Sequence, residues 1–257
     1  MTYRALIPVK SLSEAKSRLA AHLTIHQREM LVLDMLHHVL EVLLNSEMLE
    51  QVYVVSPDRQ VLQRSEKWGA QGLLEEVQGH NPALSAAASR AQATTNGALE
   101  PHGLLTISAD LPLLEVGEIH HIIEESFYHD VVLAPSPDGT GTNAILMRPP
   151  LIVPYLFGPN SLRRYLEACE QRKLSVTVYS STGLALDIDT IDDLDTLRVL
   201  RGNPVNGGPA NGGLATLAVA TTRCSPNLVS MGHSGDSRGR QARSRQARSK
   251  KGDASCP

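Results

Sequence analysis

Three aspartates are the residues best suited to chemistry in this chain of 257 residues. Asp110 follows an apolar run at 103–108, and Asp187 and Asp189 are separated by one residue. Alternate side chains of an extended segment share a face, so the second pair lies together, roughly 6–7 Å apart at the backbone. Two negative charges at this distance repel each other unless a cation or hydrogen bonds compensate them. Because magnesium takes oxygen ligands, often carboxylates together with substrate phosphates, the pattern predicts a metal site.

Each carboxylate also has a structural interpretation. Aspartate is common in turns before helices, which is an alternative role for Asp110. Asp192 and Asp193 are well explained as negative charges at the start of a helix capped by Thr190. That explanation covers Asp187 poorly, because this residue precedes the cap by three positions.

Basic residues near the start of the chain form a second group. Lys10 directly follows the first apolar run, and Lys16 and Arg18 lie in a loop or short helix behind it. Cations placed there could hold a triphosphate and neutralise a leaving pyrophosphate. A solvated basic face is the alternative for Lys16.

Two further segments combine glycine with hydroxyl side chains. Residues 136–143 read Ser-Pro-Asp-Gly-Thr-Gly-Thr-Asn and could offer backbone N–H groups to an anion, although Asp-Gly is also typical of a hairpin turn. Residues 157–161 read Phe-Gly-Pro-Asn-Ser and lead into a helix, whose N-terminus is either an anion site or simply capped. Neither contains a Walker loop or the G-x-S-x-G of a hydrolase.

The elements that must position these residues alternate along the chain. Apolar runs predict strands at 3–9, 51–55, 103–108, 131–134, 143–147 and 175–179. Start and stop signals predict helices from Thr24 to Asn45, Ser56-Pro57 to Gly69, Asn81-Pro82 to Gly97, Glu115 to Phe127, Asn160 or Ser161 to Arg172, and Thr190 to Arg201. This alternation predicts an α/β fold with a mostly parallel sheet flanked by helices. Ligands then bind at the carboxyl ends of the strands.

Composition favours a soluble protein. Hydrophobic residues make up 42% and charged residues 20% of the chain, which is ordinary for a globular domain. No apolar run approaches the roughly 18 residues of a membrane span, and the N-terminal run at 5–9 is too short for a signal peptide. The three cysteines are widely spaced, which suits a reducing compartment, so we expect a cytoplasmic location.

The last quarter of the chain has a different character. Residues 201–257 hold nine Lys or Arg and two Asp, whereas the whole chain has a net charge of -3. Arg-Gln-Ala-Arg-Ser occurs twice in tandem at 240–249. Such a segment cannot bury enough apolar surface to fold, so the sequence predicts a catalytic domain at 1–202 and a disordered basic tail at 203–257. Electrostatic contact with nucleic acid is the alternative role of the tail, and we do not favour it.

Six short motifs occur in a fixed order: Ile-Pro-Val-Lys at 7–10, Ala-Lys-Ser-Arg-Leu at 15–19, Ser-Ala-Asp-Leu-Pro-Leu-Leu at 108–114, Asp-Gly-Thr-Gly-Thr-Asn at 138–143, Phe-Gly-x-x-Ser at 157–161 and Leu-Asp-Ile-Asp-Thr at 186–190. Over about residues 1–200 they resemble the phosphoenolpyruvate or 2-phospho-L-lactate guanylyltransferases of coenzyme F-420 biosynthesis. The Asp-x-Pro-Leu-Leu element also resembles the wider nucleotide-diphospho-sugar transferase fold, a Rossmann-like fold. That wider group usually begins with a glycine-rich loop, and the Ile-Pro-Val-Lys found instead favours the F-420 branch.

The resemblance implies roles for individual residues. They are Asp110, Asp187 and Asp189 as ligands of Mg²⁺; Thr142, Gly158 and Ser161 as contacts of the phosphorylated acid; Lys10, Lys16 and Arg18 as cations near the GTP phosphates; and Asn81 as a nucleotide contact. In the motif of Asn81, His80 replaces the family's usual leucine, and Pro82 makes a pure capping role for Asn81 an alternative.

The reaction implied is transfer of GMP from GTP to phosphoenolpyruvate, with release of pyrophosphate. The attacking phosphate oxygen is already anionic near neutral pH, so no general base is required. The same residues fit 2-phospho-L-lactate as acceptor, and a molybdopterin or sugar-phosphate nucleotidyltransferase and a non-catalytic nucleotide-binding regulator are further alternatives. The sequence leaves a homodimer open and predicts no membrane partner.

Overall fold

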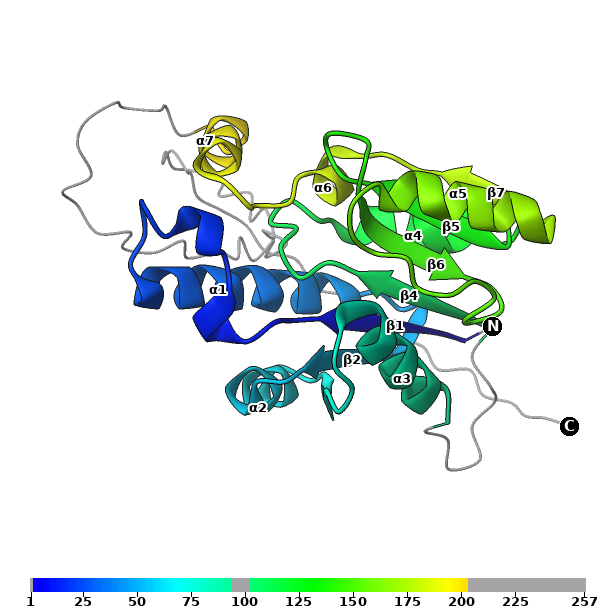
Figure 1. Cartoon of the computed structure of the whole chain (residues 1–257), viewed down its shortest axis with the longest axis horizontal. Coiled ribbons are helices and arrows are strands. Elements are labelled where there is room, and N and C mark those ends of the chain that lie inside the picture. Colours follow the sequence, from blue (N-terminus) through cyan, green and yellow to red (C-terminus); the bar gives the residue numbers. More distant parts are fainter. Residues whose placement is uncertain (1, 94–101, 203–257) are drawn as a thin grey trace, which may run out of the picture. The chain divides into compact units, whose positions relative to one another are not determined.

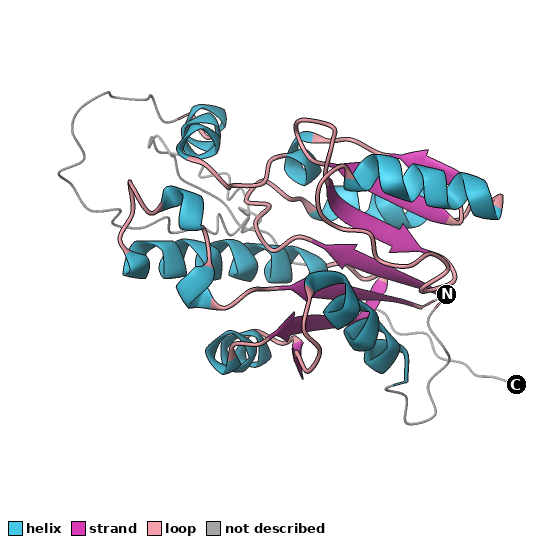
Figure 2. Ribbon diagram, viewed as in Figure 1, coloured by secondary structure: helices cyan, strands magenta, loops and turns pink. Residues whose placement is uncertain are grey.

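The computed structural model describes residues 2–93 and 102–202. In this part of the chain one mixed sheet is flanked by helices on both faces (Figures 1 and 2). The predicted tail at 203–257 and the predicted helix end at Gly97 lie outside the described residues. None of the described helices is both long enough and apolar enough to cross a membrane.

The sheet has seven strands in the order β3-β2-β1-β4-β6-β5-β7. Their bounds are β1 Tyr3–Pro8, β2 Leu49–Ser56, β3 Gln71–Leu74, β4 Gly103–Ile107, β5 Val131–Pro135, β6 Thr142–Met147 and β7 Val176–Val178. All neighbours pair in parallel except β6, which runs antiparallel to both β4 and β5. The reversal follows from the short loop 136–141, because a parallel crossover needs a dozen or more residues. The mostly parallel α/β fold expected from the sequence is confirmed.

The helices follow the predicted order. Their bounds are α1 Ile25–Leu44, α2 Arg59–Lys67, α3 His80–Ala93, α4 Val116–Glu125, α5 Ser161–Arg172, α6 Thr182–Ala185 and α7 Ile191–Leu200, with 3-10 turns η1 Leu12–Glu14 and η2 Ser17–Leu19. The predicted capping box at the start of α1 is present, with the Thr24 hydroxyl accepting from the Gln27 backbone N–H at 3.3 Å.

Two predicted helix starts are wrong. Ser56 ends β2 instead of capping α2, and Asp58 is the N-cap, its carboxylate accepting from the Gln60 N–H at 2.9 Å. Ser56 instead accepts from the backbone N–H of Asp58, which tightens the turn between strand and helix. Helix α3 begins at His80, so Asn81 lies inside the helix and does not cap it.

Alternate strand residues bury the two faces of the sheet. On one face, Ala5, Ile7, Leu105 and Leu146 pack in a cluster with apolar residues of α1, α2, α4 and α6. On the other face, strand residues such as Leu6 and Ile145 pack with α3 and α5. This alternation makes both faces of the sheet buried layers.

A third, smaller cluster lies beyond the strand ends. It joins Leu19 of η2 to Leu31 and Met35 of α1 and to the segment around Ile188 and Leu194. Because these parts are far apart in sequence, their burial brings the start of the chain against the segment that precedes α7.

Strand β6 has an irregularity at its start. Ala134 pairs with Ala144, but Pro135 pairs with Thr142, so Asn143 is an extra residue opposite β5. Such a bulge changes the direction in which the neighbouring side chains point.

Candidate active site

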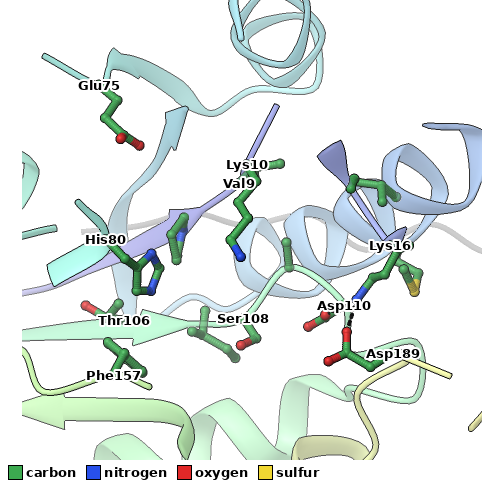
Figure 3. A pocket seen from close by; sticks show the side chains of 16 residues that line it. Val9, Lys10, Lys16, Glu75, His80, Thr106, Ser108, Asp110, Phe157 and Asp189 are labelled. Atoms are coloured by element: carbon green, nitrogen blue, oxygen red, sulfur yellow. Dashed lines mark hydrogen bonds and ion pairs between the residues drawn. The ribbon is translucent and has the colours of Figure 1, made fainter. Parts of the chain in front are cut away.

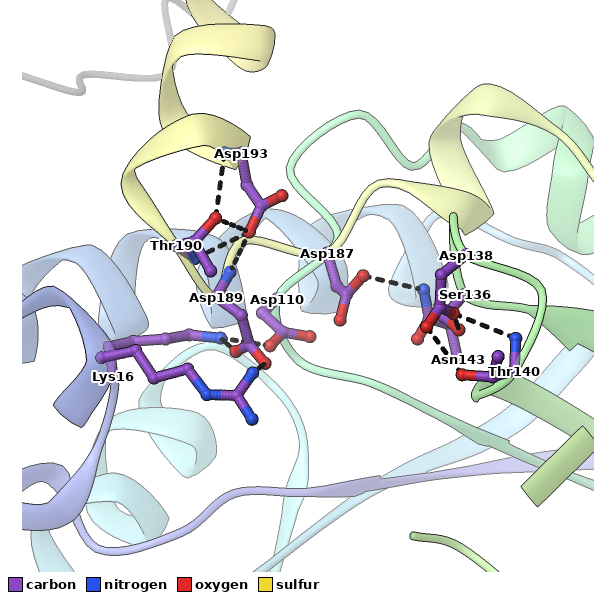
Figure 4. Close-up of polar contacts among 11 residues, drawn as sticks. Lys16, Asp110, Ser136, Asp138, Thr140, Asn143, Asp187, Asp189, Thr190 and Asp193 are labelled. Atoms are coloured by element: carbon purple, nitrogen blue, oxygen red, sulfur yellow. Dashed lines mark hydrogen bonds and ion pairs between the residues drawn. The ribbon is translucent and has the colours of Figure 1, made fainter. Parts of the chain in front are cut away.

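The structure brings the three predicted aspartates together at the carboxyl edge of the sheet (Figure 4). Asp110 follows β4, and Asp187 and Asp189 lie between α6 and α7. Each offers an oxygen, and these oxygens lie within 4.8 Å of one another. The two segments are also joined by their backbones, since the Ile188 N–H donates to the Asp110 carbonyl at 3.3 Å.

The alternation between apolar and acidic residues explains why the side chains of Asp187 and Asp189 point in the same direction. Leu186 and Ile188 are buried in the third apolar cluster. Asp187 and Asp189, which alternate with these two residues along the chain, are thereby directed to the opposite side, toward Asp110. The same cluster buries Leu19, so it also anchors the turn that carries the nearby cations.

Lys16 is the cation at the centre of this group. Its ammonium pairs with the carboxylates of Asp110 and, at 2.9 Å, Asp189, and its side chain is only 9% exposed. Burial alone lowers the pKa of Lys16, but the two carboxylates outweigh it and raise the pKa above its ordinary value. Its backbone is left-handed, with φ of 51°, a strained conformation for a residue with a side chain and one that clusters at functional sites.

Arg18 adds a second, more exposed cation. Its guanidinium lies 3.3 Å from the other oxygen of Asp189. Burial opposes ionisation of Asp189, but Lys16 above all, and then Arg18, hold its pKa below the usual range.

Asp187 is compensated least. Burial, followed by the charge of Asp110, raises its pKa to about 6. Asn143 lies at 3.5 Å from its carboxylate but donates mainly to the carbonyls of Leu184 and Ala185, at 3.0 and 2.9 Å. Three clustered oxygen donors with one carboxylate poorly neutralised are a donor set that fits a divalent magnesium ion.

Asp193 has the structural role that the sequence predicted. Its carboxylate accepts from the backbone N–H groups of Asp189 and Thr190, at 3.0 and 2.7 Å, in the capping box of α7. The cap therefore also fixes the backbone of Asp189 (Figure 4).

The glycine-rich loop is folded on itself. The Asp138 carboxylate accepts from the hydroxyls of Ser136 and Thr140, both at 2.6 Å, and these bonds hold its pKa well below the usual range. The backbone N–H groups of Gly139, Thr140 and Gly141 all bond within the loop. Of the two roles that the sequence left open for this loop, the structure favours the hairpin turn, here between β5 and β6, because these N–H groups already have partners.

The three residues predicted to contact an acid are adjacent. The Ser161 hydroxyl donates to the Thr142 hydroxyl at 3.0 Å, and both residues are buried. The Ser161 N–H donates to the Gly158 carbonyl at 3.1 Å, and Gly158 has φ of 121°, which requires glycine. The N-cap position of α5, Asn160, makes no side-chain cap, so plain capping does not account for this motif.

A cleft of about 290 Å³ opens along the carboxyl edge of β1 and β4 (Figure 3). Lys16, Asp110 and Asp189 line one end, and Glu75, His80 and Phe157 line the other. Lys10 lies between the two ends.

Asn81 has a structural task at this cleft. Its side-chain amide donates to the Phe157 carbonyl at 3.0 Å and accepts from the Phe157 N–H at 2.9 Å. The Asn81 side chain thus holds α3 against the segment that leads to Gly158. This contact was not foreseen, because it joins residues 76 positions apart.

Sequence reasoning missed three residues of the site. Asn143 was expected only at the end of the glycine-rich loop and the start of a strand, with no contact to the segment of Asp187, and Glu75 was overlooked because β3, with four residues, was not recognised. A strand there would have marked Glu75 as a strand-end residue. His80 was noticed only as a departure from the family pattern.

Comparison with known proteins identifies the family to which this chain belongs. A family model described as "Guanylyl transferase CofC like" matches residues 3–206. A phosphoenolpyruvate guanylyltransferase of Sphaerobacter thermophilus is 39% identical over 77% of this chain and 93% of its own length. A 2-phospho-L-lactate guanylyltransferase of Methanothermobacter thermautotrophicus is 33% identical over 77% of this chain and 84% of its own length.

The fold has solved relatives as well. The crystal structure of a putative nucleotide-diphospho-sugar transferase from Desulfovibrio desulfuricans aligns with a TM-score of 0.66 at 16% identity, covering 79% of this chain and 89% of that one. The nucleotide-diphospho-sugar transferase fold expected from the sequence is therefore confirmed. With the family match and the close curated relatives, this chain belongs to the CofC-like guanylyltransferases, a family of nucleotidyltransferases.

Proposed function

We propose that the protein transfers GMP from GTP to phosphoenolpyruvate and releases pyrophosphate, a step of coenzyme F-420 biosynthesis. The observation that carries this proposal is the group of three aspartates, two of which, Asp110 and Asp189, line one end of a cleft and pair with Lys16, while Lys10 lies midway along that cleft. Such a site suits a reaction whose difficulty is to bring two polyanions together.

Asp110, Asp187 and Asp189 are the residues that would hold Mg²⁺. When bound, the ion supplies charge neutralisation and alignment for attack on a phosphoryl group. The chain itself contributes the fixed carboxylates, whose positions are held by the apolar cluster around Ile188 and by the cap from Asp193.

The cations serve the triphosphate in this proposal. Lys10 reaches into the middle of the cleft, and Lys16 and Arg18 border the aspartates. Positive charge there would stabilise the departing pyrophosphate. Thr142 and Ser161, with the backbone at Gly158, would orient the phosphorylated acid.

The chemical step needs positioning more than proton transfer. An oxygen of the acid's phosphate forms a bond to the α-phosphorus of GTP, and the bond from that phosphorus to the pyrophosphate oxygen breaks. Because the nucleophile is already anionic, the residues of the site need only align it and exclude competing water.

Phosphoenolpyruvate is favoured as acceptor because the relatives carrying that name reach 39 and 38% identity. The 33% identity to a 2-phospho-L-lactate guanylyltransferase makes that acid the second candidate. The two acids share a carboxylate and a phosphate.

The test is pyrophosphate release from GTP and Mg²⁺ with each acid in turn. We expect turnover with phosphoenolpyruvate and its loss in Asp187→Ala, while Asp192→Ala, a neighbouring acidic change outside the site, retains it. Turnover only with 2-phospho-L-lactate would transfer the proposal to that acid. GTP binding without turnover on either acid would instead support a regulator.

A further inference from the structure

We infer that Glu75 recognises the guanine base, its carboxylate accepting hydrogen bonds from the N1–H and the 2-amino group of the nucleotide. This inference rests on the proposed function, since it concerns the nucleotide of that reaction. It assigns a specificity-determining role to a residue at the far end of the cleft from the aspartates.

The position of Glu75 is fixed by the sheet. It directly follows β3, and its backbone N–H donates to the carbonyl of Ser56 at the end of β2, at 3.0 Å. Its side chain lines the cleft, and Figure 3 shows it at the opposite end from Asp110 and Asp189. The backbone is thus held by two strand ends while the carboxylate borders the cavity.

Glu75 differs from the next residue in its contacts. Glu76 forms an ion pair with Arg90 at 3.8 Å, and its side chain is 65% exposed. Within residues 2–93 and 102–202, the Glu75 carboxylate takes part in no hydrogen bond or ion pair, although it is half-buried. A half-buried carboxylate without a protein partner at a cleft is free to accept bonds from a ligand.

The geometry of the cleft orients the nucleotide. The cations and aspartates at one end attract the triphosphate, so the base must extend toward Glu75, His80 and Phe157. The rings of His80 and Phe157 lie edge to face, with centroids 5.7 Å apart, and offer aromatic surface at the same end of the cleft as Glu75. A flat base therefore meets ring surface on one side and one acceptor group at its edge.

The chemistry of that acceptor selects guanine. Guanine presents two adjacent donors, N1–H and the 2-amino group, which match the two oxygens of a carboxylate. Adenine presents an acceptor at N1, which would face the negative charge and leave Glu75 unpaired. Sites that hydrogen-bond a substrate group reject analogues lacking it, because the protein group is left unpaired.

The experiment compares kcat/KM for GTP, ITP and ATP in the wild type and in Glu75→Ala and Glu75→Gln. ITP keeps N1–H but lacks the 2-amino group. We expect the wild type to prefer GTP over ITP by about 10- to 100-fold, and Glu75→Ala to lose most of that ratio through weaker use of GTP. The matched control Glu76→Ala, one residue along, should keep the wild-type ratio.

Equilibrium binding of GTP and ITP by calorimetry gives the same comparison without turnover. If the wild type binds both nucleotides but turns over neither with any acid, the proposed reaction fails while the base-recognition result still stands on its own. Thermal unfolding checks that Glu75→Ala and Glu75→Gln are folded. If both folded variants keep the wild-type preference for GTP over ITP, the inference is overturned.

Discussion

At the scale of single residues, the site is defined by an uneven distribution of charge. Lys16 forms ion pairs with Asp110 and Asp189 but not with Asp187, whose carboxylate lies close to that of Asp110. The pKa of Asp187 is raised to about 6 as a result of burial first and of that neighbour second. Without a metal ion, the negative charge of Asp187 is therefore the one that the site stabilises least.

The raised pKa of Asp187 predicts how stability changes with pH. The folded protein holds the Asp187 proton more tightly than the unfolded chain does, so this stabilising contribution is complete below about pH 4 and is lost as the pH rises through about 6. In the metal-free protein, Asp187→Asn should be more stable than the wild type near pH 8, on the order of 1–2 kcal/mol once partial solvent exposure is allowed for, with little difference near pH 4. Urea unfolding at both pH values measures it. Equal effects at the two pH values would contradict the charge argument.

The residue scale also shows where sequence reasoning stops. Asp110, Asp187 and Asp189 could be selected because strand ends and period-two alternation are local signals. The burial of Lys16 could not be predicted, because its contact with Asp189 spans 173 positions and depends on how η2 packs. Asn143 escaped notice for the same reason, since its partners lie on α6 and beyond.

At the scale of elements, the start of α7 supports the site directly. Asp193 accepts three hydrogen bonds from Asp189 and Thr190, whereas the carboxylate of Asp192 takes part in none within the described part of the chain. We expect Asp193→Ala to lower the free energy of unfolding by about 1–2 kcal/mol, as the loss of a helix cap does. Asp192→Ala should change it by less than about 0.5 kcal/mol.

Denaturant titration of the two variants gives the comparison. Because the cap also fixes the Asp189 backbone, Asp193→Ala should in addition reduce turnover, which Asp192→Ala should not. Equal destabilisation by both changes would show that general helix-terminus charge, and not the cap geometry, is what matters.

Elements were predicted where their signals were strong. The capping box at Thr24 and the apolar run at 103–107 gave α1 and β4, because several local features agreed there. Strand β3 and helix α6 have four residues each, too few to show a period. The start of α2 was misplaced since Ser56, a good cap by type, is buried at the end of a strand.

At the scale of the whole molecule, the family match ends at residue 206. We predict that a chain shortened to residues 1–206 keeps its unfolding temperature, and its kcat/KM for GTP within about twofold, because the polar and basic composition of residues 207–257 predicts no apolar core. Thermal unfolding and pyrophosphate release compare the two lengths. A marked loss of either would give the tail a role in the folded enzyme.

The same pair of chains tests the alternative role of the tail. RNA binding by the full chain that weakens steeply with salt and disappears on shortening would indicate an electrostatic contact with nucleic acid. No binding by either chain is the outcome that we expect.

The overall fold was the most predictable level, because alternating strands and helices admit few arrangements. The direction of β6 was not predicted, since a run of apolar residues carries no information about which way its strand runs. Substrate identity depended on resemblance throughout, because carboxylates and lysines near a cleft suit many phosphoryl transfers.

The extra residue in β6 decides which side of the sheet each polar side chain reaches. Ala144 and Leu146 face the layer of α1 and α4, whereas Ile145 and Met147 face the layer of α3 and α5. Continued without interruption, that alternation would turn Thr142 toward α6. The bulge exchanges these directions, so that Thr142 meets Ser161 while the next side chain reaches α6. One inserted residue thus sends two neighbouring side chains to opposite faces, Thr142 to the site proposed for the acid and Asn143 to the segment that carries Asp187, and deleting it would remove both contacts.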